Sequence, residues 1–84
     1  MLYYLLICRS LTYAQRTAFL LERAGITAHI LRSPRGLVEE GCSHAVKIQE
    51  RSLSLALSVL ARSDLSPKRI FVMTADGSYS EVEQ

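Results

Sequence analysis

The sequence predicts a small α+β protein, and three observations lead to that class. Short apolar or alternating segments typical of strands occur at residues 2–8, 26–31, 44–49 and 68–74. Two segments between them repeat apolar residues at helical spacing. The length of 84 residues allows one domain, expected to cover residues 1–84. The resulting βαββαβ order predicts a ferredoxin-like sandwich, in which a four-stranded antiparallel sheet carries both helices on one face.

The first half of the chain predicts a central strand and a helix. Residues 2–8 are apolar on both alternating faces, which is typical of a strand inside a sheet. Ser10 and Thr12 are both suitable N-caps for the helix that follows, and the sequence leaves its start open between them. Gly25 fits the position just beyond the helix C-terminus. The apolar stripe of this helix consists of Leu11, Ala14, Ala18 and Leu21.

The second half predicts three strands, one helix and an irregular loop. Pro34 ends the strand at residues 26–31, because proline cannot donate to a central ladder. Residues 35–43 show no regular pattern, and residues 44–49 alternate again. Ser52 can cap a second helix, which ends before residues 63–67, and the fourth strand follows. Residues 74–84 are acidic and are expected to fray.

One face of this sheet has no predicted cover. The sequence leaves open which sheet face the helices cover. If they cover the face of Leu2, Tyr4, Leu6, Val46 and Ile48, the other face carries Tyr3, Leu5, Ile7, Leu31, Phe71 and Met73. The opposite assignment leaves a similarly apolar face uncovered. An exposed apolar patch of that size usually marks an interface. We therefore predict a homodimer, or a complex with a partner protein, through the open sheet face.

Composition and charge exclude several classes of function. The net charge of +2 is too small by itself to indicate a nucleic-acid partner, although residues 1–73 hold ten basic against five acidic residues. The strand at residues 44–49 lacks the aromatic residues with which a sheet of this topology binds RNA, so a nucleic-acid partner is not expected. No apolar run reaches the ~18–20 residues that span a bilayer, and no basic segment precedes the apolar start, so a cytoplasmic protein without a membrane anchor is expected. The chain has two cysteines, which are too few for a disulfide framework. With two histidines and no CxxC pair, the sequence does not predict a zinc site, and no cofactor motif is present.

The predicted topology gathers reactive and basic residues at one end of the sheet. The four chain segments that meet there contain Cys8, Arg9, Ser10, Arg32, Arg35, Cys42, His44, Lys68 and Arg69. A thiol near cations or a helix N-terminus has a lowered pKa, and its thiolate is the nucleophile. Cys42 lies in a glycine-containing loop and is expected to be accessible. Cys8 alternates in phase with Leu6, which favours packing in the core.

The other candidates leave alternatives open. Arg35, directly after Pro34, could bind an anion or orient a thiolate, or could be a solvated loop charge. His44 could share a proton with Cys42, although a packed or solvated histidine is the more common case. Lys68 and Arg69 could dock an acidic partner or could simply begin a strand. A disulfide between the two cysteines would make a redox switch a competing interpretation.

Two stretches of the chain resemble a small bacterial family of selenium/sulfur carrier-like proteins. The stretches read "RSLTYAQRTAFLLERAGI" and "SPRGLVEEGC", and their specific residues are Pro34, Arg35 and Cys42. The family usually has glycine directly after the cysteine, whereas this chain has Ser43. The resemblance implies a carrier or accessory role in sulfur or selenium transfer, with protein partners and without enzymatic activity of its own.

Two function classes follow. In the first, Cys42 holds a sulfur or selenium atom as a persulfide or selenosulfide, with Arg35 stabilising the anion and Arg9, Ser10, Pro34, His44, Lys68 and Arg69 lining the site. In the second, the chain is a non-catalytic module that binds a protein or a small ligand through the open sheet face.

Overall fold

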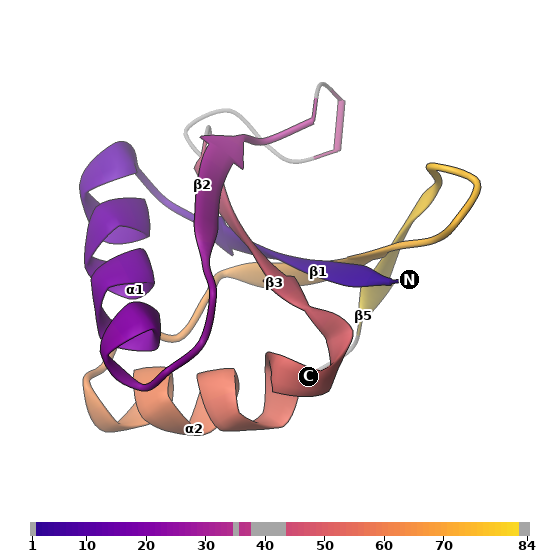
Figure 1. Cartoon of the computed structure of the whole chain (residues 1–84). Helices are drawn as coiled ribbons and strands as arrows, with labels where there is room; N and C mark the ends of the chain where they lie inside the picture. The colour runs from indigo at the N-terminus through magenta and orange to yellow at the C-terminus, as the bar shows by residue number, and fades with distance from the viewer. Residues whose placement is uncertain (1, 35, 38–43, 83–84) are drawn as a thin grey trace.

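The computed structural model describes residues 2–34, 36–37 and 44–82. In this part of the chain, a five-stranded antiparallel sheet packs against two helices (Figure 1). The strand order is β2-β3-β1-β4-β5, and β1 lies in the middle. The elements are β1 (Tyr3–Cys8), α1 (Leu11–Arg23), β2 (His29–Arg32), β3 (His44–Gln49), η1 (Glu50–Ser52), α2 (Leu53–Arg62), β4 (Arg69–Met73) and β5 (Tyr79–Val82).

The predicted α+β class, with two helices and an antiparallel sheet, is confirmed, but the predicted number of strands is wrong. Residues 74–84 were expected to fray, and β5 forms in that segment and pairs with β4. Asp76 and Gly77 make the turn between the two strands. Gly77 has a φ of 86°, and the Asp76 carboxylate accepts hydrogen bonds from the Thr74 hydroxyl and from the Ser78 amide. The turn therefore has the residue types that a tight hairpin requires.

The caps of α1 fix its position at the end of β1. The Ser10 hydroxyl accepts a hydrogen bond from the Tyr13 amide at 3.3 Å, so Ser10 and not Thr12 is the N-cap. At the other end Gly25 has a φ of 84°, and the Ile26 amide donates to the Leu21 carbonyl at 2.9 Å. These bonds form a Schellman motif, which confirms the predicted role of Gly25.

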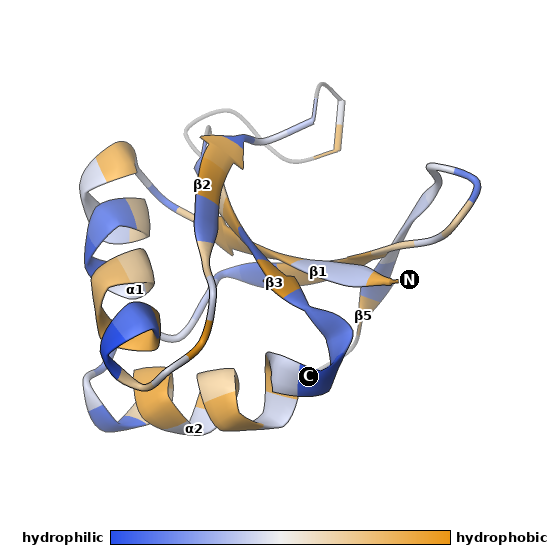
Figure 2. Ribbon diagram, in the orientation of Figure 1, coloured by the Kyte–Doolittle hydropathy of each residue, from blue (hydrophilic) through white to orange (hydrophobic). Residues whose placement is uncertain are grey.

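Both helices cover the same face of the sheet. Figure 2 shows hydrophobic residues along both helices and along the central strands. The apolar side chains of the helices share one buried cluster with those of β1, β3 and β4. The cluster consists of Leu6, Cys8, Ala14, Leu21, Ile26, Val46, Ile48, Ala56, Leu60 and Ile70. Leu6, Val46 and Ile48 therefore lie on the helix side, which is one of the two assignments that the sequence left open.

The opposite sheet face holds a second, smaller core and is not the open patch that we predicted. Leu5, Ile7 and Phe71 are 1%, 0% and 4% exposed in the single chain. They form a buried cluster with Ala45, against which Leu31, Leu37 and Tyr79 pack. Tyr79 comes from β5, the strand that the sequence analysis missed. A homodimer through this face remains a prediction. That prediction assumed that these three side chains are exposed, and this assumption is wrong.

Candidate functional site

The strand register brings sequence-distant residues together at one end of the sheet. Cys8, at the end of β1, lies directly opposite His44, and His44 lies opposite Arg32 of β2. On the other side of β1, Ile7 lies opposite Arg69, and the Lys68 amide donates to the Ile7 carbonyl at 2.9 Å. The described segments that were expected to meet at this end therefore do meet there.

Cys8 is a buried residue of the main core. Its side chain is 4% exposed. Its Sγ lies 3.6 Å from the Leu6 carbonyl oxygen and 3.9 Å from the Thr17 Oγ1, both within the range of weak sulfur hydrogen bonds. This placement agrees with the packing that the alternation of β1 predicted. It also means that access to the thiol depends on the space in front of it.

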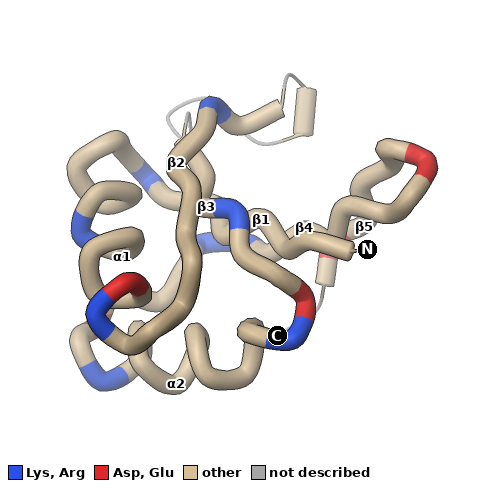
Figure 3. The backbone as a smooth tube through the Cα atoms, viewed as in Figure 1, with Lys and Arg blue, Asp and Glu red and all other residues tan. Residues whose placement is uncertain are grey.

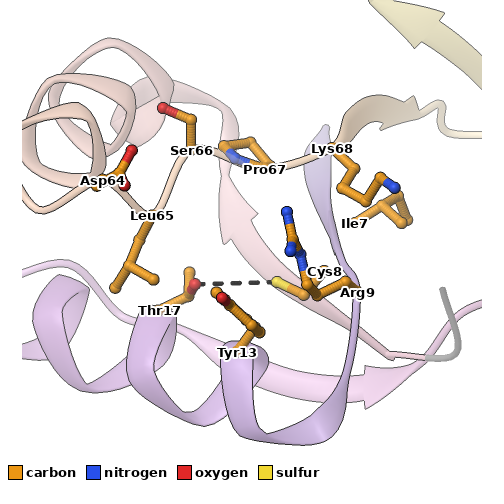
Figure 4. A pocket seen from close by; sticks show the side chains of 10 residues that line it. All are labelled: Ile7, Cys8, Arg9, Tyr13, Thr17, Asp64, Leu65, Ser66, Pro67 and Lys68. Atoms are coloured by element: carbon orange, nitrogen blue, oxygen red, sulfur yellow. Dashed lines mark hydrogen bonds between the residues drawn. The ribbon is translucent and has the colours of Figure 1, made fainter. Parts of the chain in front are cut away.

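That space is a cavity of about 270 Å³ between the end of β1, the first two turns of α1 and the loop that joins α2 to β4 (Figure 4). Cys8 and Thr17 contribute polar atoms to its wall, and Leu65 and Pro67 contribute apolar surface. The full lining is Ile7, Cys8, Arg9, Tyr13, Thr17, Asp64, Leu65, Ser66, Pro67 and Lys68. The cavity therefore combines one thiol, hydroxyl groups and charges from three separate elements.

The charges around this cavity are mainly positive. Arg9 directly follows β1, and its guanidinium carbon lies 4.8 Å from the centroid of the Tyr13 ring. Figure 4 shows this guanidinium reaching into the space between Cys8 and Pro67. Lys68 also lines the cavity, but its ammonium points away from Cys8 and Thr17 in Figure 4, and Asp64 supplies one carboxylate at the rim. Stacking on Tyr13 orders the Arg9 side chain, which otherwise would be a mobile surface charge.

Arg69 lies outside this cavity. Its guanidinium binds the Glu81 carboxylate through two contacts, Nε to Oε2 at 2.9 Å and a second nitrogen to Oε1 at 2.6 Å. It also lies 5.0 Å from the centroid of the Phe71 ring, on the sheet face away from the helices. The hydrogen bond from Arg69 lowers the pKa of Glu81. Arg69 thus links β4 to β5 rather than adding a charge to the cavity.

The remaining predicted site residues have varied positions. Ser10 is the N-cap of α1, where its hydroxyl satisfies a helix amide. Pro34 is half-buried, and its carbonyl accepts a hydrogen bond from the Leu37 amide at 3.2 Å. His44 begins β3 beside Cys8. Arg35 and Cys42 lie outside the described residues, as does any disulfide between the two cysteines.

Sequence reasoning missed Thr17 and Tyr13. Thr17 lies outside the four residues predicted as the apolar stripe of this helix, yet it is 2% exposed and contacts Cys8. One signal was available in the sequence. Thr17 lies between Ala14 and Ala18 on the helix face predicted to be buried, and a hydroxyl buried there needs a hydrogen-bond partner. The α2–β4 loop gave no comparable signal, because its contribution to the wall depends on tertiary packing.

The chain matches the family described as putative Se/S carrier protein-like over residues 3–72. The matched segment contains both the Pro34–Arg35 pair and Cys42, and it runs from the start of β1 into β4. The chain belongs to this Se/S carrier-like family. The resemblance stated from the two sequence stretches is therefore confirmed. No curated protein and no solved structure shows a significant match.

Two further observations concern the described part of the chain. Among residues 2–34, 36–37 and 44–82, no three histidine, cysteine or acidic side chains are grouped closely enough to hold a metal ion. Neither of the two described helices has the length and apolar character that would allow it to cross a bilayer.

Proposed function

We propose that the chain carries sulfur or selenium, or assists its transfer, by holding the atom on the thiolate of Cys42. Loading is a displacement in which the Cys42 thiolate attacks the terminal sulfur of a donor persulfide. The donor S–S bond breaks, and the donor thiolate leaves with the electron pair. Cys42 then holds a persulfide, or a selenosulfide where the transferred atom is selenium. An acceptor nucleophile reverses this step and releases the Cys42 thiolate.

The observation that carries this proposal is the family match, which includes Pro34, Arg35 and Cys42. In the sequence, Cys42 is two residues before His44, the first residue of β3. The sheet end at which His44 lies carries Arg32, which pairs with His44, Arg9, which directly follows β1, and the N-terminus of α1. Figure 3 shows basic residues near the ends of β1 and β2. Positive charges and helix amides favour a thiolate over a thiol.

Two roles in this proposal come from the sequence alone. Arg35 would stabilise the negative charge on the terminal sulfur or selenium, and Lys68 would help to dock an acidic partner protein. Lys68 is exposed at the start of β4, which is compatible with docking. The alternative function, a binding module that acts through the sheet face opposite the helices, loses support because Leu5, Ile7 and Phe71 are buried there.

The test is alkylation of Cys42 as a function of pH, with each cysteine followed by mass spectrometry of its own peptide. We expect Cys42 to react with an apparent pKa below the ordinary value of ~8.5. We also expect persulfide loading by a low-molecular-weight persulfide to be lost in Cys42→Ala and retained in Cys8→Ala. A Cys42 thiol that titrates at the ordinary value and reacts slowly would refute the proposal.

A further inference from the structure

The cavity in front of Cys8 has no role in the carrier step proposed for Cys42, yet it has the features of a binding site. Its volume of about 270 Å³ far exceeds the ~10–15 Å³ that one water needs on the same measure. It is slightly below the ~300 Å³ at which pockets for drug-sized ligands begin. A ligand of this cavity is therefore small.

A buried hydroxyl in the cavity wall points to a polar ligand. The Thr17 side chain is 2% exposed, and its Oγ1 lies 3.9 Å from Cys8 Sγ. A hydroxyl can make up to three hydrogen bonds, so this weak contact leaves capacity for a stronger one. Valine would fill the same space without the cost of burying a hydroxyl. Fold stability alone therefore does not account for threonine at this position.

The charges identify the ligand as an anion. Arg9 lies against the Tyr13 ring with its guanidinium in the cavity. Asp64 is the one acidic residue of the lining, and Figure 4 shows its carboxylate at the other side of the cavity from this guanidinium, whereas the Lys68 ammonium points away from Cys8 and Thr17. The first turn of α1 contains no acidic side chain that would compete with a bound anion. Guanidinium and hydroxyl donors together match the oxygens of a small oxyanion.

We infer that the cavity formed by Cys8, Arg9, Tyr13, Thr17 and Lys68 binds a small sulfur oxyanion of the sulfite or thiosulfate class. The choice of a sulfur compound among small oxyanions rests on the proposed carrier function, whereas the choice of an anion rests on the cavity. In this arrangement Arg9 neutralises the oxyanion, and Thr17 donates a hydrogen bond from the buried end of the cavity. The binding is reversible and involves no covalent change at Cys8.

Calorimetric titration with thiosulfate and sulfite tests this inference, in the Cys42→Ala background so that no chemistry at Cys42 contributes. We expect saturable binding that weakens at least tenfold in Arg9→Gln. Asp64→Asn removes the negative rim charge and is expected to strengthen binding. The matched control is Arg62→Gln, because Arg62 is an exposed arginine of α2 that does not line the cavity.

Protection of Cys8 locates the ligand. Thiosulfate is expected to slow alkylation of Cys8 in the Cys42→Ala protein and to have little effect on it when Arg9→Gln is also present. The inference is overturned if thiosulfate does not bind, if Arg9→Gln and Arg62→Gln bind it equally, or if phosphate and acetate bind as tightly as thiosulfate.

The two proposals fail in different experiments. Binding of thiosulfate that depends on Arg9 supports the cavity assignment even where Cys42 carries no persulfide, which would refute the carrier function alone. Normal persulfide loading of Cys42 without thiosulfate binding would overturn the cavity assignment and leave the carrier function in place.

Discussion

Cys8 and His44 lie directly opposite each other across the β1–β3 ladder, at the end where β1 leads into α1. Because side chains alternate along a strand, both residues belong to the sheet face that the helices cover. Ile7 and Arg69 form the neighbouring pair and face the opposite side. The two sides of this sheet end therefore differ in chemistry. The helix side holds the thiol and the cavity, and the other side holds the Arg69–Glu81 ion pair.

Substitution of Thr17 by valine (Thr17→Val) removes the buried hydroxyl and keeps the shape of the side chain. It therefore tests whether the hydroxyl serves ligand binding or the stability of the fold. We expect the free energy of unfolding to be unchanged or raised by up to ~1 kcal/mol, because valine removes a poorly satisfied buried hydroxyl. Thiosulfate binding is expected to weaken severalfold in the same variant. Urea unfolding and calorimetry measure the two quantities.

Thr12→Val is the control, because Thr12 is an exposed threonine of the same helix and its substitution should change stability by less than ~0.5 kcal/mol. A loss of more than ~1.5 kcal/mol in Thr17→Val would show that the fold itself requires the hydroxyl.

The C-termini of the two helices offer a matched pair of substitutions. Gly25 after α1 and Asp64 after α2 both have left-handed backbones, with φ values of 84° and 56°. A side chain in this region costs roughly 1–2 kcal/mol. We therefore expect Gly25→Ala to lower the free energy of unfolding by about 1 kcal/mol and Asp64→Gly to raise it, although by less, because aspartate tolerates this conformation better than alanine.

Chemical denaturation of both variants gives the two changes. A Cβ added at Gly25 would lie more than 4 Å from every heavy atom described around it, apart from its chain neighbours, so a loss there reports the backbone alone. Equal stability of Gly25→Ala and the parent protein would contradict the left-handed conformation.

Much of the fold could be predicted because local patterns and packing agree. The alternation of residues 44–49 gave the bounds of β3, and Gly25 gave the end of α1. The strand predicted from residue 26 begins only at His29, for an identifiable reason. The Ile26 amide bonds back to the Leu21 carbonyl, and the Ala28 amide donates to the Glu22 carboxylate at 2.9 Å, so these amides are not available to the ladder.

The features that sequence reasoning missed depend on contacts between distant residues. Strand β5 pairs with β4 along an antiparallel ladder, and the Arg69–Glu81 ion pair also joins the two strands. The Asp76–Gly77 pair was a local signal for this hairpin, but the acidic composition of the segment was given more weight. The strand also supplies Tyr79, which packs on the second core and helps to bury the face that was predicted to be open. The cavity was missed because its far wall comes from the α2–β4 loop, whose position depends on tertiary packing.

Ile7→Ala tests whether the second sheet face is a core of the single chain. Ile7 is fully buried in that cluster, so the truncation is expected to lower the free energy of unfolding by about 2–5 kcal/mol. Leu55→Ala is the control, since Leu55 is 50% exposed on α2 and its truncation should cost less than ~0.5 kcal/mol. Equal small effects of the two substitutions would contradict burial of Ile7.

The same experiment addresses assembly. The cost of Ile7→Ala is expected to be independent of protein concentration, because Ile7 is covered within one chain. A denaturation midpoint that rises with protein concentration in the parent protein and not in Ile7→Ala would instead place this face in a homodimer. Sedimentation of the parent protein at the same concentrations gives the oligomeric state directly.

Acid is expected to loosen the β4–β5 hairpin through Asp76. Hydrogen bonds from the Thr74 hydroxyl and from Ser78 lower the pKa of Asp76 from 3.8 to about 2. A carboxyl with a lowered folded-state pKa stabilises the fold above its unfolded value, and that contribution is lost as the pH falls through the folded value. The hairpin should therefore weaken between about pH 4 and pH 2. Glu81, whose pKa is also lowered, adds a change of the same sign.

NMR titration of the Asp76 carboxyl carbon measures its pKa directly, and exchange of the Ser78 amide follows opening of the turn. Asp76→Asn should remove part of the acid sensitivity, since asparagine keeps the side-chain acceptor without the titrating charge. Tyr79 packs on the second core, so opening of the hairpin should also increase exposure of that ring at low pH. A titration midpoint near 3.8 with an unchanged Ser78 amide would show that Asp76 does not hold the turn.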